Sequence, residues 1–497
     1  YVGLVLAELR RRTKKPLVVV APDARRAEEL SLALRFFEST ESELDPVPMV
    51  ESLSHSPFSG MSPPRLQVMD RTSTFFRLVH ELEISAVVVC AEALIDRVIP
   101  RSVLSEIAEL VVAGETLDRE SFLTFLVHAG YHHVPAVEDP GTFATRGGII
   151  DVYCPLYTNP VRIDLWGDEV ESVRFFDPTS QRSIATLDEL ILGPARDILF
   201  QEETIARARD SIRTLADQMN VPSSRSRAMV ADVEAGILGV GMEDLLPAFY
   251  DSLDPITELL PRDAYWVVDE PERCATLIRE RWKDVSARSD RVRKGGGELA
   301  FEARDLFIND EEALKRLGET TRCNLETLEV ASSPVPPERR WTFSARDNLD
   351  LRQEIQAATQ AGQERVLAPL TRQVRQWRDE GWAVVACAHR GGGIERLAGL
   401  MGHYGLKVER HEGSFHLELL EGLQKSPSEI HLFIGDPGSG FRAPDHGLVI
   451  LDEGEILGRR PRRRRRHARV SPEAALESWR DLQVGDMAVH LQHGLGR

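Results

Sequence analysis

The chain has 497 residues, of which 42% are hydrophobic and 28% charged, and its formal net charge is −18. This length predicts about three or four domains with ordinary hydrophobic cores, which excludes global disorder. The acidic balance excludes wrapping of nucleic acid by the whole surface, because phosphate contacts need clustered Lys and Arg.

Other classes are excluded by what the sequence lacks. No apolar run reaches the ~18 residues that span a membrane, so we expect no membrane partner. The five Cys are scattered singly, which fits neither a zinc ribbon nor a thioredoxin-like site and is typical of the cytoplasm. Because the sequence starts at Tyr1 without Met and stops after a Gly-rich turn, we expect a piece of a longer protein.

Residues 1–110 predict an α/β domain. Pro16–Ala21 is an apolar, β-branched run, as in a strand covered on both faces, and Ser85–Ala91 is a second one. Between them, apolar residues repeat at helical spacing over Ala24–Phe37, with Asp23 in position to cap that helix.

Residues 111–192 predict a small β-rich module after a helix over Leu117–Ala129. The predicted strands are Gly148–Tyr153, Pro160–Trp166 and Glu169–Phe176. Gly167-Asp168, between the last two strands, is typical of a hairpin turn.

The remaining chain alternates again between helical patterns and predicted strands. Residues 193–331 are mostly helical in pattern with one strand, Ala264–Val268, and the Pro-rich Ser332–Arg339 predicts a linker. Residues 340–457 predict a further α/β domain, whose strands are Trp382–Ala388, Ile430–Gly435 and Leu448–Leu451. An Arg-rich linker at 458–482 and the start of another β unit at 483–497 follow. The fold class is therefore multidomain α/β.

The sequence offers no reaction centre. A phosphate-binding G-x-x-x-x-G-K-[ST] loop is absent, and Gly391–Gly393 lacks the Lys and hydroxyl that such a loop needs. Two strands end in Asp-Glu, at Asp269-Glu270 and Asp452-Glu453, but such carboxylates hold Mg²⁺ only beside a phosphate loop. We predict no catalytic residue, no metal site and no cofactor in this chain.

The β-rich module carries the first binding feature. Arg162, Asp164 and Trp166 have period 2 and therefore share one face of their strand. Exposed Arg and Trp are typical of protein-binding hot spots. The alternative is equally supported by composition: Trp166 packs in the core and the Arg side chains pair with acidic neighbours, namely Asp168, Glu169 and Glu171.

The second binding feature is Arg459–Arg469, which holds eight Arg. Arg462, Arg463, Arg464, Arg465 and Arg466 are consecutive and can neutralise phosphates of DNA. No aromatic residue is interleaved, so base stacking is not indicated. A solvated linker is the favoured alternative, because like charges repel.

Four blocks, the first of them in two segments, resemble known families. GTFATRGGIIDVYCP (141–155) and PVRIDLWGDEVESVRFFDPTSQRS (160–183) resemble the excision-repair damage sensor UvrB and, more closely, the bacterial transcription-repair coupling factors (Mfd). The segments 62–78, 239–272 and 484–497 also resemble the coupling factors, although Pro64-Arg65 replaces an expected His-Gln. The UvrB alternative requires a Tyr-rich DNA-clamping hairpin, and Ser52–Arg71 has no Tyr.

The resemblance implies a UvrB-like α/β module with an inserted UvrA-binding domain, a further α/β domain, and the start of a Tudor/CarD-like domain that binds the RNA polymerase β subunit. It implies a parent that displaces stalled polymerase with an ATP- and Mg-dependent translocase on double-stranded DNA and then recruits UvrA, whose binding face is otherwise masked. This chain itself is expected to be non-catalytic. The implied site residues are Arg146, Arg162 and Trp166 for UvrA, His493, Gly494 and Leu495 for polymerase, and Asp269 and Glu270 as a degenerate nucleotide site.

Overall fold

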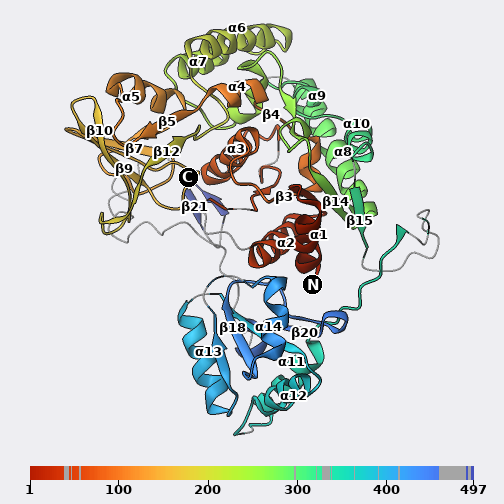
Figure 1. Cartoon of the computed structure of the whole chain (residues 1–497). Coiled ribbons are helices and arrows are strands. Elements are labelled where there is room, and N and C mark those ends of the chain that lie inside the picture. The colour runs from red at the N-terminus through yellow and green to blue at the C-terminus, as the bar shows by residue number, and fades with distance from the viewer. Residues whose placement is uncertain are drawn as a thin grey trace. The chain divides into compact units, whose positions relative to one another are not determined.

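The computed structural model forms two compact units, residues 1–453 and 454–497. It describes residues 1–38, 44–45, 47–54, 57–295, 298–320, 322–326, 336, 339–362, 364–389, 391–411, 413, 415–457, 488–490 and 494–496. Within these residues, no helix has both the length and the apolar character needed to cross a membrane. The predicted multidomain α/β class is confirmed (Figure 1).

The first sheet is parallel and lies between two layers of helices. Its strand order is β15 (Arg322–Leu325), β14 (Tyr265–Asp269), β1 (Leu17–Ala21), β3 (Ala86–Cys90) and β2 (Met49–Val50). Odd-numbered β1 residues pack with α1 (Val2–Thr13) and α2 (Ala24–Phe37), whereas the even-numbered ones pack with α3 (Arg65–His80) and α8 (Pro271–Gly295). Burial on both faces explains why β1 and β3 are continuous apolar runs.

β14 joins this sheet from far along the chain. It pairs in parallel with β1, so that Val18 lies opposite Trp266. The mostly helical stretch thus completes the sheet that the N-terminal residues begin, and the β-rich module is an insertion between the two parts. The helices of this stretch are α6 (Glu202–Gln218), α7 (Ser223–Glu234), η2 (Met242–Ala248), η3 (Ile256–Glu258), α8, α9 (Ala303–Leu306) and α10 (Asp310–Gly318).

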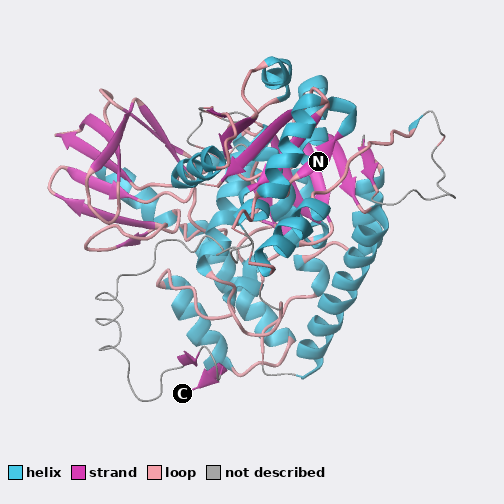
Figure 2. Ribbon diagram, turned by 90° about the horizontal axis from the view of Figure 1, so that it is seen from below, coloured by secondary structure: helices cyan, strands magenta, loops and turns pink. Residues whose placement is uncertain are grey.

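The inserted module is built on a six-stranded sheet with α5 (Arg119–His128) on its inner face. The strand order is β11 (Ser183–Leu187), β10 (Glu169–Phe176), β9 (Val161–Trp166), β8 (Ile149–Val152), β7 (Thr142–Arg146) and β6 (His132–His133). All pairs are antiparallel except β6 with β7. These strands gather on one side of the first sheet and its helices in both views (Figures 1 and 2).

Shorter elements connect the module to the first sheet. They are η1 (Ala91–Ile95), β4 (Arg97–Val98), α4 (Arg101–Glu106), β5 (Glu109–Val112), β12 (Glu189–Leu192) and β13 (Asp254–Pro255). β5 pairs with β12, and β4 pairs with β13, both antiparallel. The two ends of the insertion are therefore held side by side by β5 and β12.

A second sheet forms after the linker. Its order is β17 (Val408–Arg410), β18 (Ile430–Ile434), β16 (Ala383–Ala388), β20 (Leu448–Asp452) and β19 (Phe441–Ala443), and only β19 is antiparallel. Its helices are α11 (Leu349–Gln360), α12 (Ala368–Asp379), α13 (Gly391–His403), η5 (Leu417–Leu419), α14 (Leu420–Lys425), η6 (Pro444–His446) and α15 (Glu453–Leu457). In the second unit, the described strands β21 (Ala488–His490) and β22 (Gly494–Gly496) pair antiparallel.

Candidate protein-interaction face

β9 separates a buried face from an outward face of the module. Val161, Ile163 and Leu165 are buried against the inner core, and the three residues between and after them point outward. This alternation places Arg162, Asp164 and Trp166 on one face, because successive side chains of a strand point to opposite sides. We call the outward surface of β7 to β10 the outer face.

Trp166 is the most exposed aromatic side chain of the outer face. It ends β9, directly before the hairpin turn, and 80% of its surface is exposed. Gly167 in that turn has a φ of +64°, a backbone conformation that glycine adopts without steric cost. The alternative in which Trp166 packs in the core is therefore wrong.

Arg162 is held by the protein itself. Its Nε and Nη2 atoms donate to the two carboxylate oxygens of Asp151 on β8, at 2.7 and 2.8 Å. The guanidinium also lies over the Phe176 ring, 4.6 Å from its centroid, and donates to Gln181 at 3.2 Å. Arg162 therefore pairs across strands, and not with the acidic residues of the hairpin that the alternative named.

Arg146 and Asp164 share a row across the sheet. Ile149 on β8 lies opposite Arg146 on one side and opposite Asp164 on the other. Arg146 is exposed and donates one hydrogen bond to the Pro135 carbonyl at 3.1 Å. Asp164 is neutralised by an ion pair with Arg174 on β10.

The outer face thus combines an exposed indole with guanidinium groups. Among the described residues, the hydrogen-bonding partner of Arg146 is a carbonyl, so its charge is available to a carboxylate of a partner. Arg162 is part-buried and already bidentate to Asp151, so it presents less free hydrogen-bonding capacity. This arrangement suits docking of a protein with an apolar, acidic surface.

The predicted nucleotide relic lies elsewhere, at the end of β14. Asp269 is 3% exposed, and its carboxylate accepts a hydrogen bond from Arg26 Nε on α2 at 2.7 Å. Glu270 follows with a φ of +51°, and its backbone N–H donates to the Leu325 carbonyl at 2.9 Å. The Arg26 guanidinium is therefore paired with the Asp269 carboxylate that a Mg²⁺ ion would need as a ligand.

Two groups of predicted residues fall outside the described residues. These are His493 and the run Arg462, Arg463, Arg464, Arg465 and Arg466. Gly494 and Leu495 lie in β22, opposite His490 and Val489.

Sequence reasoning missed two clusters of metal-ligand types in the second sheet. One is His389, Asp436 and Asp452, and the other is Glu409, His411 and His431. The available signal was weak: Glu409 and His411 have the period of a strand face, but their partner His431 is twenty positions further on. Only strand pairing brings the three together.

Comparison with known proteins places this architecture. A family model described as the UvrB interaction domain matches residues 110–197, which contain the whole six-stranded sheet. The transcription-repair-coupling factor of Myxococcus xanthus is 33% identical over 506 residues, covering 100% of this chain and 41% of that protein. The factor of Escherichia coli (strain K12) is 26% identical over 498 residues, covering 99% of this chain and 40% of that protein.

The chain belongs to the transcription-repair-coupling factors. It spans about two fifths of the length of these relatives. The coupling factor of Mycobacterium tuberculosis (strain CDC 1551 / Oshkosh) shows the same relation, with 27% identity over 501 residues that cover 97% of this chain and 38% of that protein. In this coupling-factor segment, the outer face belongs to the region matched by the UvrB interaction domain.

Proposed function

We propose that this chain is the recruitment segment of a factor that couples transcription to nucleotide excision repair, and that its outer face binds UvrA. The parent would displace lesion-stalled RNA polymerase with an ATP- and Mg-dependent translocase on double-stranded DNA, in the part of its relatives' length that this chain does not span.

The observation that carries the UvrA proposal is the position of Trp166. A large aromatic side chain that is 80% exposed at the end of a rigid strand costs little conformational entropy when it is buried by a partner. Arg146 adds a charge on the same face, in a module that matches the UvrB interaction domain. Indole and guanidinium groups are the side chains that contribute most to protein interfaces.

The test is the affinity of the chain for purified UvrA, measured by calorimetry. We expect Trp166→Ala to weaken binding by about 30-fold, which corresponds to the ~2 kcal/mol typical of a hot-spot residue. Because Trp166 is exposed, this variant should fold with unchanged stability. Arg146→Ala should weaken binding less, since a solvent-exposed charge contributes less than a buried aromatic anchor.

Trp341 provides a matched control. It is 74% exposed and lies outside the module, before α11. Trp341→Ala removes the same side chain from a similarly exposed position and should leave UvrA binding unchanged. Equal affinities of the Trp166→Ala variant and the unmodified chain would contradict the proposed face.

We further propose that the segment alone is non-catalytic. The Arg26–Asp269 ion pair supports this, because it neutralises the carboxylate at the end of β14. Calorimetry with ATP and Mg²⁺ should show no binding to the isolated chain. ATP binding that disappears in an Asp269→Ala variant would contradict this proposal.

The polymerase-binding proposal concerns the second unit. The β21–β22 pairing supports the start of a small Tudor/CarD-like β domain that would contact the RNA polymerase β subunit through residues around Gly494 and Leu495.

If the run Arg462–Arg466 contacts DNA, the affinity of the chain for DNA should fall steeply with salt concentration and disappear when the run is replaced.

A further inference from the structure

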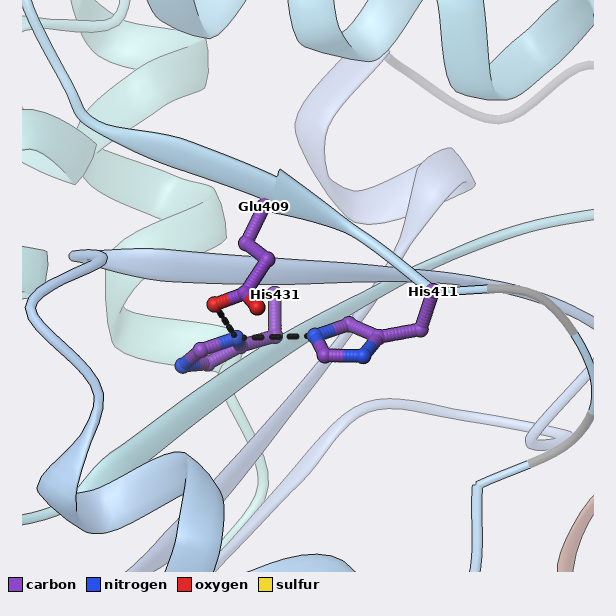
Figure 3. Close-up of side chains that lie close together, drawn as sticks. All are labelled: Glu409, His411 and His431. Carbon is purple, nitrogen blue, oxygen red and sulfur yellow. Dashed lines mark hydrogen bonds and ion pairs between the residues drawn. The ribbon is translucent and has the colours of Figure 1, made fainter.

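Three potential metal ligands converge at the edge of the second sheet. Glu409 on the edge strand β17 lies directly opposite His431 on β18. The backbone N–H of His411 donates to the Leu432 carbonyl at 2.9 Å, which extends the parallel pairing by one residue. Glu409 and His411 are two positions apart, so they share the sheet face on which His431 lies (Figure 3).

The donor atoms of the cluster face one another at short range. His411 Nε2 lies 3.0 Å from His431 Nδ1, and His431 Nδ1 lies 3.3 Å from Glu409 Oε2 (Figure 3). When two imidazole nitrogens bind the same Zn²⁺ ion, each at ~2.1 Å and with a tetrahedral angle between them, the nitrogens are about 3.4 Å apart. A small rotation of the rings therefore brings all three atoms to ligand distance of one ion.

The buried ring of His431 is fixed in the tautomer that binds metal. Its Nε2 atom lies 3.2 Å from the Leu423 carbonyl, which can only accept, so Nε2 carries the proton. This leaves the lone pair of Nδ1 directed at the other two residues. A carbonyl on the second ring nitrogen is the usual outer support of a metal-binding His.

The Leu423 carbonyl that fixes this ring is itself held by a second donor. The Arg378 guanidinium donates to the same carbonyl oxygen at 3.2 Å.

The other two ligands are also oriented before any ion binds. The His411 ring stacks on Phe433 with a centroid distance of 4.6 Å and an interplanar angle of 5°. Glu409 Oε2 accepts a hydrogen bond from Ser426 Oγ at 2.8 Å. The Glu409 side chain is 43% exposed, so the open side of the cluster faces solvent. Three protein ligands with an open side leave room for water as a fourth ligand.

We propose that Glu409, His411 and His431 form a binding site for a divalent transition-metal ion of the Zn²⁺ type. Two His and one Glu are a ligand set that Zn²⁺ takes in proteins, with the fourth position left to water or another oxygen donor. Without an ion, the same geometry is a hydrogen bond in which His411 Nε2 donates to His431 Nδ1.

The test uses the full chain, freed of metal by chelation, and Zn²⁺ alone as the probe. We expect calorimetry to show uptake of one Zn²⁺ per chain. His411→Ala and Glu409→Gln should each weaken the affinity by about 100-fold, since even outer-shell changes cost 10–100-fold. Both side chains reach the surface, so these variants are expected to fold. In NMR spectra, Zn²⁺ should shift the ring signals of His411 and His431 together.

The second cluster supplies the matched control. His389 directly follows β16 of the same sheet and lies near two carboxylates, but its Nε2 is already hydrogen-bonded to Asp452 at 2.7 Å. His389→Ala should leave Zn²⁺ binding unchanged. No Zn²⁺ uptake by the unmodified chain would show that the cluster is a hydrogen bond only, and would overturn the proposal. Uptake that persists in His411→Ala, or that is lost in His389→Ala, would overturn it as well.

Discussion

Asp151 accepts both hydrogen bonds of its carboxylate from one guanidinium, that of Arg162 on the neighbouring strand. Asp151 is only 5% exposed, so without Arg162 it would be a buried carboxylate with no counter-charge. This pair gives the outer face of the module a structural role in addition to its proposed role in binding.

Arg162→Ala is therefore expected to destabilise the module by about 2–3 kcal/mol, because a buried charge loses its partner. Chemical denaturation followed by circular dichroism measures this loss. In the double variant Asp151→Ala/Arg162→Ala, the total loss should be smaller than the sum of the single losses by about 1–2 kcal/mol. Additive losses would show that the pair does not interact. Because Arg162→Ala also destabilises the module, loss of UvrA binding in this variant is weaker evidence for the proposed binding face than loss of binding in Trp166→Ala.

The Arg26–Asp269 pair makes a second stability prediction. Arg26→Ala leaves the carboxylate at the end of β14 buried and unpaired, and it should lower the free energy of unfolding by about 3 kcal/mol. Arg25 is the matched control, since its side chain is 76% exposed and forms its ion pair with Glu29 on the same helix. Arg25→Ala should change stability by no more than about 0.5 kcal/mol. Similar losses in both variants would contradict a specific role for Arg26.

The two glycines of the β7–β8 turn are expected to differ. A Cβ on Gly148 would lie 2.5 Å from the backbone oxygen of Leu165, which cannot move without disturbing β9. Gly147 has a φ of +60° but open space around a Cβ, so alanine there meets only backbone strain. Denaturation should show a loss of about 1 kcal/mol for Gly147→Ala and a clearly larger loss for Gly148→Ala. A larger loss of stability for Gly147→Ala than for Gly148→Ala would contradict the close contact between Gly148 and the Leu165 backbone.

His132 predicts a pH effect on the module. Partial burial, and then the charges of Arg65 and Arg196, lower its pKa from 6.5 to about 4. Arg196 Nη2 lies 3.0 Å from His132 Nε2, so the guanidinium donates to a neutral ring. Between pH 6.5 and 4 the unfolded chain binds a proton that the folded chain does not, so the free energy of unfolding should fall as the pH falls through this range.

Histidine NMR titration checks this directly. The ring of His132 should titrate well below pH 6.5, and His132→Gln should reduce the loss of stability between pH 6.5 and 4. A His132 pKa at or above 6.5 would contradict the contact with Arg196.

Local patterns predicted the fold well because they depend on neighbouring residues. The strand Glu169–Phe176 and the helix Ala24–Phe37 have the predicted bounds, since alternation and helical spacing are visible in the sequence. The period of β9 also predicted which residues share the outer face.

The partners of these residues were not predictable, because strand pairing and register decide them. Asp151 meets Arg162 only because β8 and β9 are in register, and Arg26 meets Asp269 only because β14 returns beside β1. The same holds for His411 and His431, which come together through the pairing of β17 with β18. Periodicity gives a side chain its face, but it does not give the neighbouring strand.

The return of β14 to β1 also sets an order of events during synthesis of the protein. Leu17 leaves the ribosome 248 residues before Tyr265, the residue that lies opposite it in the sheet. At 5–20 residues per second, β1 waits about 12 to 50 s for its partner strand β14. The inserted module has its own sheet and is complete by then. It can therefore fold during translation, before the domain that carries it.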